Sequence, residues 1–153
     1  MGVPVSAQAV ANALIRLAAE EKRPLTNMQL QKLVFLGQGY CLALLGSPLY
    51  FNNTHAWQWG PVVPKLYKEL QKYGSAQVTE EIPAEDVLSA DSKEYGIIQA
   101  VWNAYRKFTG SQLSQLTHLP GSPWAKTWET SKFGVIPIEA IQTYYRDRLA
   151  ARK

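Results

Sequence analysis

The chain has 153 residues, of which 46% are hydrophobic and 18% are charged. This balance excludes an intrinsically disordered chain, because disordered sequences have fewer apolar residues and more net charge. No stretch reaches the roughly 18 apolar residues of a membrane-spanning helix, and no basic segment followed by an apolar one opens the chain, so no secretory signal is predicted. Because Cys41 is the one cysteine, no internal disulfide can form. We expect a single cytoplasmic domain over residues 1–153.

The net charge of +4 is concentrated at the C-terminal end. Residues 1–145 carry twelve basic and eleven acidic side chains, a balance of +1. The remaining excess lies in residues 146–153, a basic end that complements the dipole of a final helix. We therefore expect the core of the domain at about residues 6–145. The charge is weak evidence for nucleic acid, and we expect neither nucleic acid nor a membrane as the partner.

Two helices are predicted in the first third of the chain. Ser6 can cap a first helix that runs to about residue 21, because its hydroxyl can accept a hydrogen bond from the first turn. Thr26 and Gln29 have the spacing of a capping box, which opens the second helix. Gly46 can adopt the left-handed conformation that ends it.

The next segment has a different character. The aromatic residues at 55–59 alternate with others, as is typical of a short strand. Gly60-Pro61 is expected to break this strand, and Pro64 suits the first turn of a helix. The elements expected here are a strand within residues 49–59, a helix over residues 64–73 and a second short strand over residues 77–82.

The second half of the chain is predicted to be mainly helical. Asp91 and Glu94 repeat the capping-box spacing, and Ile98 and Trp102 continue an apolar stripe behind them. The sequence therefore predicts a mainly α, compact single-domain helical bundle with a short antiparallel β element. The remaining elements expected are helices over residues 91–108, 111–118 and 138–151, a brief helix holding Trp124 and Trp128, and a third short strand over residues 133–136.

Two unusual motifs stand out, and they follow residues 30–35 (Leu-Gln-Lys-Leu-Val-Phe) in the chain. The first is Ala-Trp-Gln-Trp-Gly-Pro-Val at residues 56–62. The second is Leu-Ser-Gln-Leu-Thr-His at residues 113–118, followed by Pro123-Trp124. This order of motifs resembles the Panacea domain family, also called SocA-like and often labelled as phage-associated proteins of the GepA type. The resemblance runs from about residue 6 to residue 145.

The resemblance implies an antitoxin of a toxin–antitoxin system, often encoded in a prophage, that neutralises a cognate toxin by direct contact. One branch of the family is similar to proteolytic adaptors, which deliver the toxin to an ATP-dependent protease. The sequence leaves these two mechanisms, the identity of the toxin and the oligomeric state open. The motif positions carried over by the resemblance are Trp57, Gly60, Pro61, Val62, Thr117, His118 and Trp124.

Each motif has a structural and a functional interpretation. The segment from Trp59 to Val62 can be a strand-to-helix corner or a rigid aromatic platform for a partner. Lys65, Lys68 and Lys72 are spaced on one helical face, and residues 80–94 form an acidic segment. Both can be solvated surfaces or can steer a charged partner. The lysines could also contact phosphates. The candidate partner-binding residues are Trp57, Trp59, Gly60, Pro61, Val62, Lys65, Lys68 and Lys72, whereas Thr117, His118 and Trp124 are expected to be structural.

Catalysis is the alternative class. His118 could act as the acid or base of a hydrolase, but no Gly-x-Ser-x-Gly nucleophile motif is present and Cys41 lies inside a helix. His55 and His118 with one cysteine do not form a structural zinc set, and Gly37-Gln38-Gly39 lacks the third glycine and the strand of a nucleotide loop. We expect no catalytic residue, metal or cofactor. A DNA-binding regulator is a third class, but only the C-terminal arginines are comparable to a basic recognition helix.

Overall fold

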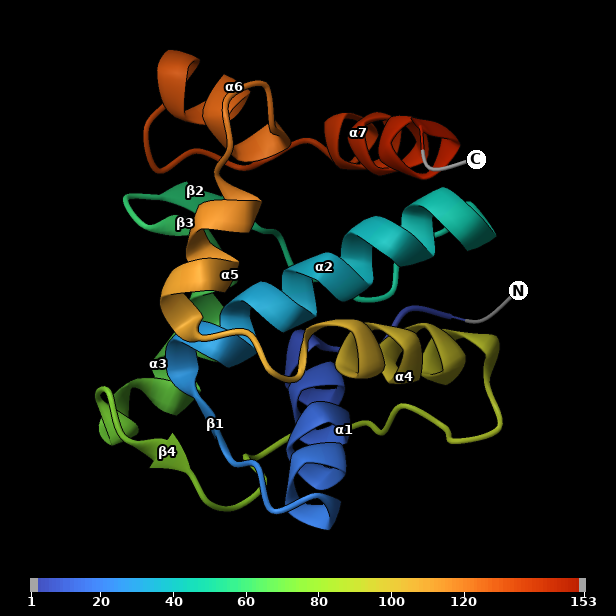
Figure 1. Ribbon diagram of the computed structural model, residues 1–153, viewed down its shortest axis with the longest axis vertical. Helices are drawn as coiled ribbons and strands as arrows, with labels where there is room; N and C mark the ends of the chain where they lie inside the picture. The colour runs from blue at the N-terminus through green and yellow to red at the C-terminus, as the bar shows by residue number, and fades with distance from the viewer. Residues whose placement is uncertain (1–2, 152–153) are drawn as a thin grey trace.

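The computed structural model describes residues 3–151, and it consists mainly of helices (Figure 1). This confirms the predicted mainly α class with a minor antiparallel β component. Arg152 and Lys153, part of the predicted basic end, lie outside the described residues. The α-helices are α1 (Ala7–Glu20), α2 (Asn27–Leu45), α3 (Pro64–Leu70), α4 (Lys93–Tyr105), α5 (Gly110–Thr117), α6 (Pro123–Thr130) and α7 (Ile138–Ala151), and a short 3-10 helix, η1 (Gln71–Tyr73), follows α3.

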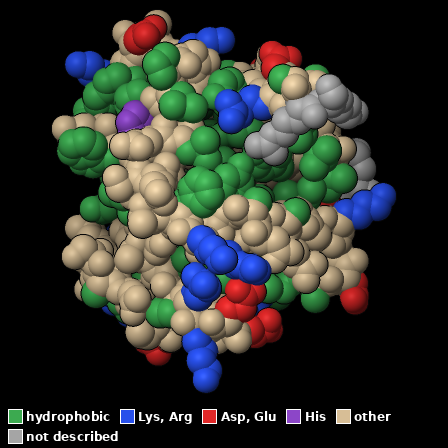
Figure 2. Space-filling model, in the orientation of Figure 1, with side chains coloured by type: hydrophobic (Ala, Val, Ile, Leu, Met, Phe, Trp, Pro, Cys, Tyr) green, Lys and Arg blue, Asp and Glu red, His purple; other side chains and the backbone are tan. Residues whose placement is uncertain are grey.

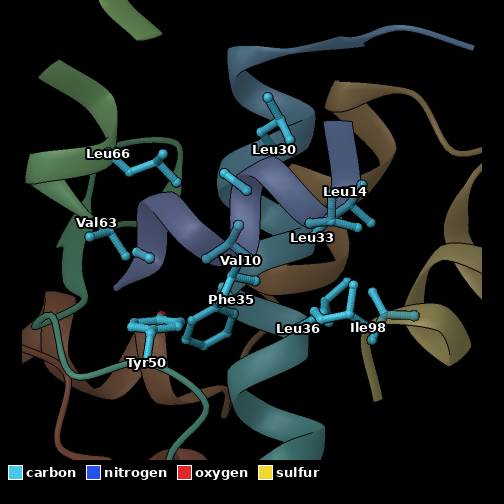
Figure 3. Packing of buried hydrophobic residues seen from close by; sticks show 14 of the residues in the cluster. Val10, Leu14, Leu30, Leu33, Phe35, Leu36, Tyr50, Val63, Leu66 and Ile98 are labelled. Carbon is cyan, nitrogen blue, oxygen red and sulfur yellow. The ribbon is translucent and has the colours of Figure 1, made fainter. Parts of the chain in front are cut away.

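Helix α2 lies at the centre of the fold and packs against α1, α4, α5 and α7 (Figure 1). Residues 31–39 of this helix are all buried, because other elements surround it on every side. Its apolar side chains therefore point in several directions: Figure 3 shows Leu33 near Leu14 of α1, and Leu36 near Ile98 of α4. A helix buried on all sides needs apolar residues around its whole circumference rather than on one stripe.

The two glycines in the middle of α2 allow its neighbours to approach closely. A Cβ atom on Gly37 would lie 2.7 Å from the Cδ1 atom of Ile98 in α4. A Cβ atom on Gly39 would meet the ring of Tyr145 in α7. These two glycines therefore serve close helix–helix contact. No helix among residues 3–151 combines the length and the apolar character that a membrane crossing requires.

Most predicted helix ends are confirmed by their hydrogen bonds. Ser6 accepts a hydrogen bond from the backbone N–H of Ala9, at 3.1 Å. Thr26 and Gln29 form both bonds of the capping box, and Gly46 is left-handed, with φ = 76°. These ends depend on neighbouring residues alone, which is why they can be read from the sequence.

The predicted capping box at Asp91 and Glu94 is wrong. Ser92 caps α4 instead, because its Oγ atom accepts a hydrogen bond from the N–H of Tyr95 at 3.1 Å. Ser92 also donates to the carbonyl oxygen of Ser89, at 2.6 Å, which fixes the loop before the helix. A capping box that the sequence analysis missed, formed by Thr109 and Gln112, opens α5.

The β component consists of two small antiparallel sheets. Strand β1 (Leu25–Thr26) pairs with β4 (Gln77–Val78), which is shorter than the strand predicted over residues 77–82. Strand β2 (His55–Trp57) pairs with β3 (Gly60–Val62). We expected Gly60-Pro61 to end the strand region, and this is wrong: the pair begins the return strand of a hairpin. The third predicted strand, residues 133–136, is reduced to one antiparallel bridge between Val135 and His55.

Candidate partner-binding site

The β2–β3 hairpin displays the aromatic motif, and side chains from three helices form hydrogen bonds with its backbone. The indole N–H of Trp124 in α6 donates to the carbonyl oxygen of Trp57, at 2.6 Å. Ser114 of α5 donates to the carbonyl oxygen of Trp59, at 2.5 Å. Lys32 of α2 donates to the carbonyl oxygen of Pro61, at 2.9 Å. Every second carbonyl group from Trp57 to Pro61 is therefore bound by a side chain.

The residue that follows the hairpin is fixed by the same helix. Gln31, next to Lys32, accepts a hydrogen bond from the N–H of Val63 at 3.0 Å. The side chains of Gln31 and Lys32 are both buried. On the other side, the N–H of Ala56 donates to the carbonyl oxygen of Gly134, at 2.9 Å. Buried polar groups are normally paired in this way, and the result here is a hairpin with a fixed position on the helical body.

The two motifs that carry the family resemblance thus form one structural unit. Thr117 places its Oγ1 atom 3.3 Å from where a Cβ atom on Gly60 would lie. The His118 ring lies 5.1 Å from the ring of Trp124, and its Nδ1 atom is 3.4 Å from the Oγ atom of Ser114. Thr117 and Trp124 therefore contact the hairpin and His118 packs on Trp124. These positions suit the structural role predicted for the three residues.

An apolar pocket of about 560 Å³, which we call the hairpin pocket, opens beside the hairpin. Trp57, half-buried, packs edge-on against Tyr67 of α3, with 5.1 Å between the ring centroids. Trp59, Phe133 and Met28 are 63%, 56% and 39% exposed and lie around the pocket. Large apolar side chains gathered at an open pocket are typical of a binding surface.

Other hydrophobic side chains are gathered over the upper half of the face drawn in Figure 2, where α2, α5 and α7 lie. Leu44 and Leu149 line a smaller hollow of about 200 Å³. Among the described residues no charged side chain lines that hollow, whereas Lys32 lines the hairpin pocket. The hairpin pocket therefore combines apolar surface with a polar group that can orient a partner.

Of the predicted binding residues, only some meet at this pocket. Trp57, Trp59 and Val62 line it, while Gly60 and Pro61 are buried in the hairpin. The predicted lysine face lies elsewhere. Lys65 lines a separate hollow with Glu85 and Asp86, and Lys72 lies over the ring of Tyr73; the exposed residues of this face, Lys65, Lys68 and Lys72, are not among those lining the pocket.

The sequence analysis missed Lys32, the most unusual side chain of the site. Lys32 is only 2% exposed, and burial lowers its pKa from 10.5 to about 7. A low-dielectric environment disfavours the charged ammonium form, which is the cause of such shifts. The signal in the sequence was a Gln-Lys pair inside a helix that is mainly apolar around its whole circumference.

The buried lysine predicts a dependence of stability on pH. Between about pH 7 and pH 10.5 the unfolded chain keeps the Lys32 proton and the folded chain releases it, so the free energy of unfolding rises with pH. We expect a gain of about 2 kcal/mol between pH 7 and pH 9, from 1.36 kcal/mol per proton and pH unit. Urea unfolding of the wild type and of Lys32→Met across this range measures it.

The Lys32→Met variant is the control, because it should lack this rise. Burial raises the pKa of Cys41 to about 12, which acts in the opposite direction near pH 9, but both proteins contain Cys41 and the difference between them removes its effect. Parallel curves for the two proteins would contradict a lowered Lys32 pKa.

Gly60 is predicted to tolerate no side chain. Its φ is +118°, and a Cβ atom there would lie 3.2 Å from the Cε atom of Lys32. We expect Gly60→Ala to lower the free energy of unfolding by about 1–3 kcal/mol, the usual cost of a strained backbone position. Gly96→Ala is the matched control: nothing lies within 4 Å of its Cβ position in α4, so this change should stabilise the helix by about 0.5–1 kcal/mol. Equal effects of the two changes in urea unfolding would refute the prediction.

Histidine and acidic side chains do not gather at the pocket. His55 bonds through Nδ1 to the carbonyl oxygen of Phe133, at 2.9 Å, and His118 lies behind the hairpin with Trp124. Among residues 3–151 no group of three or more His, Cys, Asp or Glu side chains could hold a metal ion. The described lining therefore offers apolar contact and hydrogen bonding, from the buried amine of Lys32 and from neutral polar side chains such as Asn27 and Gln58.

Comparison with known proteins identifies the family. The family described as "Antitoxin SocA-like, Panacea domain" matches residues 30–125, a range that contains both motifs and Lys32. Antitoxin SocA of Caulobacter vibrioides (strain NA1000 / CB15N) is 32% identical over 129 residues, which cover 78% of this chain and 69% of that protein. No solved structure is significantly similar. The chain belongs to the SocA-like antitoxin family with a Panacea domain.

Proposed function

We propose that the chain is the antitoxin of a toxin–antitoxin system and that it neutralises its toxin by binding it at the hairpin pocket. The observation that carries this proposal is Trp59, which stands 63% exposed at the tip of a hairpin that three helices hold in place. Exposed tryptophans on a rigid support are the side chains that contribute most to protein–protein affinity.

The size of the surface supports the same proposal. A standard interface buries about 800 Å² on each partner, and the described part of the chain exposes 8145 Å². A toxin that covers the hairpin and its surroundings would thus use about a tenth of the surface. Neutralisation by this route requires no chemistry, because covering the toxin's own active site is sufficient.

Co-expression tests the proposal directly. The product of the neighbouring gene is expressed in a host cell alone, with this chain, and with this chain carrying Trp59→Ala. We expect growth arrest with the neighbouring product alone, rescue by the wild-type chain, and reduced rescue by the variant. A harmless neighbouring product, or arrest that the wild-type chain does not relieve, would refute the antitoxin function.

The fate of the bound toxin separates two mechanisms. The half-life of the toxin is measured after synthesis is stopped, with and without this chain. An unchanged or longer half-life is expected for neutralisation by binding alone. A half-life that this chain shortens, and that recovers when the ATP-dependent proteases of the host are inactivated, would instead identify the chain as a proteolytic adaptor.

A further inference from the structure

Lys32 is a buried amine with no carboxylate partner among the described residues. Its ammonium group has three N–H donors, and the carbonyl oxygen of Pro61 is the one acceptor found for it among the described residues. The ion pairs among the described residues are Arg16–Glu81 and Arg106–Glu21, and neither involves Lys32. Buried charges are costly unless they are paired, so a group that only holds one carbonyl oxygen could be replaced by a neutral donor at lower cost.

The surroundings of Lys32 favour an anion. The first turn of α2, with Asn27 and Met28, and the first residue of α5, Gly110, line the pocket. The N-terminal end of a helix carries partial positive charge. Neither aspartate nor glutamate occurs among the described residues that line the pocket, where Tyr67 of α3 is the only titratable side chain besides Lys32. The described lining thus offers the partial positive charge of two helix ends, an amine that can be protonated, and no carboxylate of its own.

We infer that the hairpin pocket receives an aspartate or glutamate side chain of the toxin, carried on an apolar segment, and that its carboxylate pairs with Lys32. This inference rests on the proposed antitoxin function. The volume of about 560 Å³ accommodates several side chains, which is why we assign a continuous segment rather than a chain terminus. The apolar neighbours of the acidic residue contact Trp59 and Phe133, and water excluded by them strengthens the ion pair.

Pairing with a carboxylate has a proton balance that can be measured. Lys32 is largely neutral at pH 8, because burial lowers its pKa to about 7. A carboxylate beside it favours the ammonium form, so the complex takes up one proton from the solvent. Above pH 8 the affinity is therefore expected to fall about tenfold for each pH unit, until the pH reaches the raised pKa of Lys32 in the complex.

The experiment is isothermal titration of the purified chain with an inactive variant of the neighbouring gene product. It is done at pH 8 in two buffers of different ionisation enthalpy, with wild type, Lys32→Met and Lys107→Met. We expect uptake of about one proton by the wild type and none by Lys32→Met, whose Kd is at least about 30-fold higher. Lys107→Met, which removes an exposed lysine that does not line the pocket, should bind like the wild type.

The outcomes separate this inference from the function on which it rests. If the wild-type chain does not bind the neighbouring product, the proposed function fails. If Lys32→Met binds as well as the wild type, or no proton is taken up, the carboxylate pairing fails and the antitoxin function stands. The melting temperature of Lys32→Met shows whether this variant folds. If it does not fold, proton uptake by the wild type alone decides whether the carboxylate pairing stands.

The source of the carboxylate is tested on the partner. Changing each Asp and Glu of the toxin to Asn or Gln should produce one variant that loses affinity for the wild-type chain and loses nothing further with Lys32→Met. A Gly-Ser extension at the toxin's C-terminus should have no effect. Loss of binding through the extension alone would assign the carboxylate to the chain terminus and overturn the inferred side chain.

Discussion

Replacing Trp59 with alanine is expected to weaken toxin binding by at least about 2 kcal/mol, or roughly 30-fold in Kd, the range of a binding hot spot. The indole is 63% exposed, so the fold depends little on it. The hairpin keeps its position without this side chain, because Ser114 binds the backbone carbonyl of residue 59 and not the ring. Titration calorimetry on the purified complex, with urea unfolding of the variant, measures both effects.

Phe51→Ala provides the control for this prediction. Phe51 is an aromatic side chain that is 61% exposed, close to the 63% of Trp59. It lines the separate hollow near Asp86 and not the hairpin pocket. We expect its removal to leave Kd within about threefold of the wild type, as for most residues outside a hot spot. If Phe51→Ala weakened binding and Trp59→Ala did not, the toxin would bind elsewhere on the chain.

Gln38→Leu is expected to lower the free energy of unfolding by about 3–5 kcal/mol. Gln38 is fully buried in α2. Its Oε1 atom accepts from the N–H groups of Leu49 and Tyr50, at 2.6 and 3.2 Å, and its Nε2 atom donates to the carbonyl oxygen of Tyr50, at 3.1 Å. Leucine would leave these three buried backbone groups without partners, at about 1–3 kcal/mol each before relaxation.

Gln115→Leu makes the same chemical change at an exposed position of α5. Surface changes of this kind are usually within about 0.5 kcal/mol. Urea unfolding of the two variants at one pH compares them, and a loss below about 1 kcal/mol for Gln38→Leu would show that the segment at Leu49 and Tyr50 is held by other contacts.

The helices could be predicted because their signals are local. Ser6, Thr26 and Gly46 act on residues within one turn of themselves, and each has the predicted role. The last helix likewise has the predicted bounds, Ile138–Ala151. Local rules also explain the error at Asp91: two residues able to cap a helix stand side by side, and only the geometry of the preceding loop selects Ser92.

The site could be predicted only in part, because it depends on contacts between distant segments. Trp57, Trp59 and Val62 were identified from their motif, and they line the pocket. The turn between β2 and β3, residues 58 and 59, contains none of the residues that usually mark a two-residue hairpin. The contact of Lys32 with Pro61, 29 residues later, has no local signal. Whether an aromatic side chain is displayed or buried is also decided by tertiary structure. Trp59 is exposed and Trp124 buried, although both belong to family motifs.

The way the hairpin is held has a consequence for how such antitoxins diversify. Trp124, Ser114 and Lys32 bind carbonyl oxygens, which every amino acid possesses. The exposed side chains at residues 58 and 59 can therefore be exchanged in evolution without loss of these anchoring bonds. Under the proposed binding at the hairpin pocket, substitutions at these exposed positions would change which toxin is recognised, while the helices that fix the hairpin stay the same.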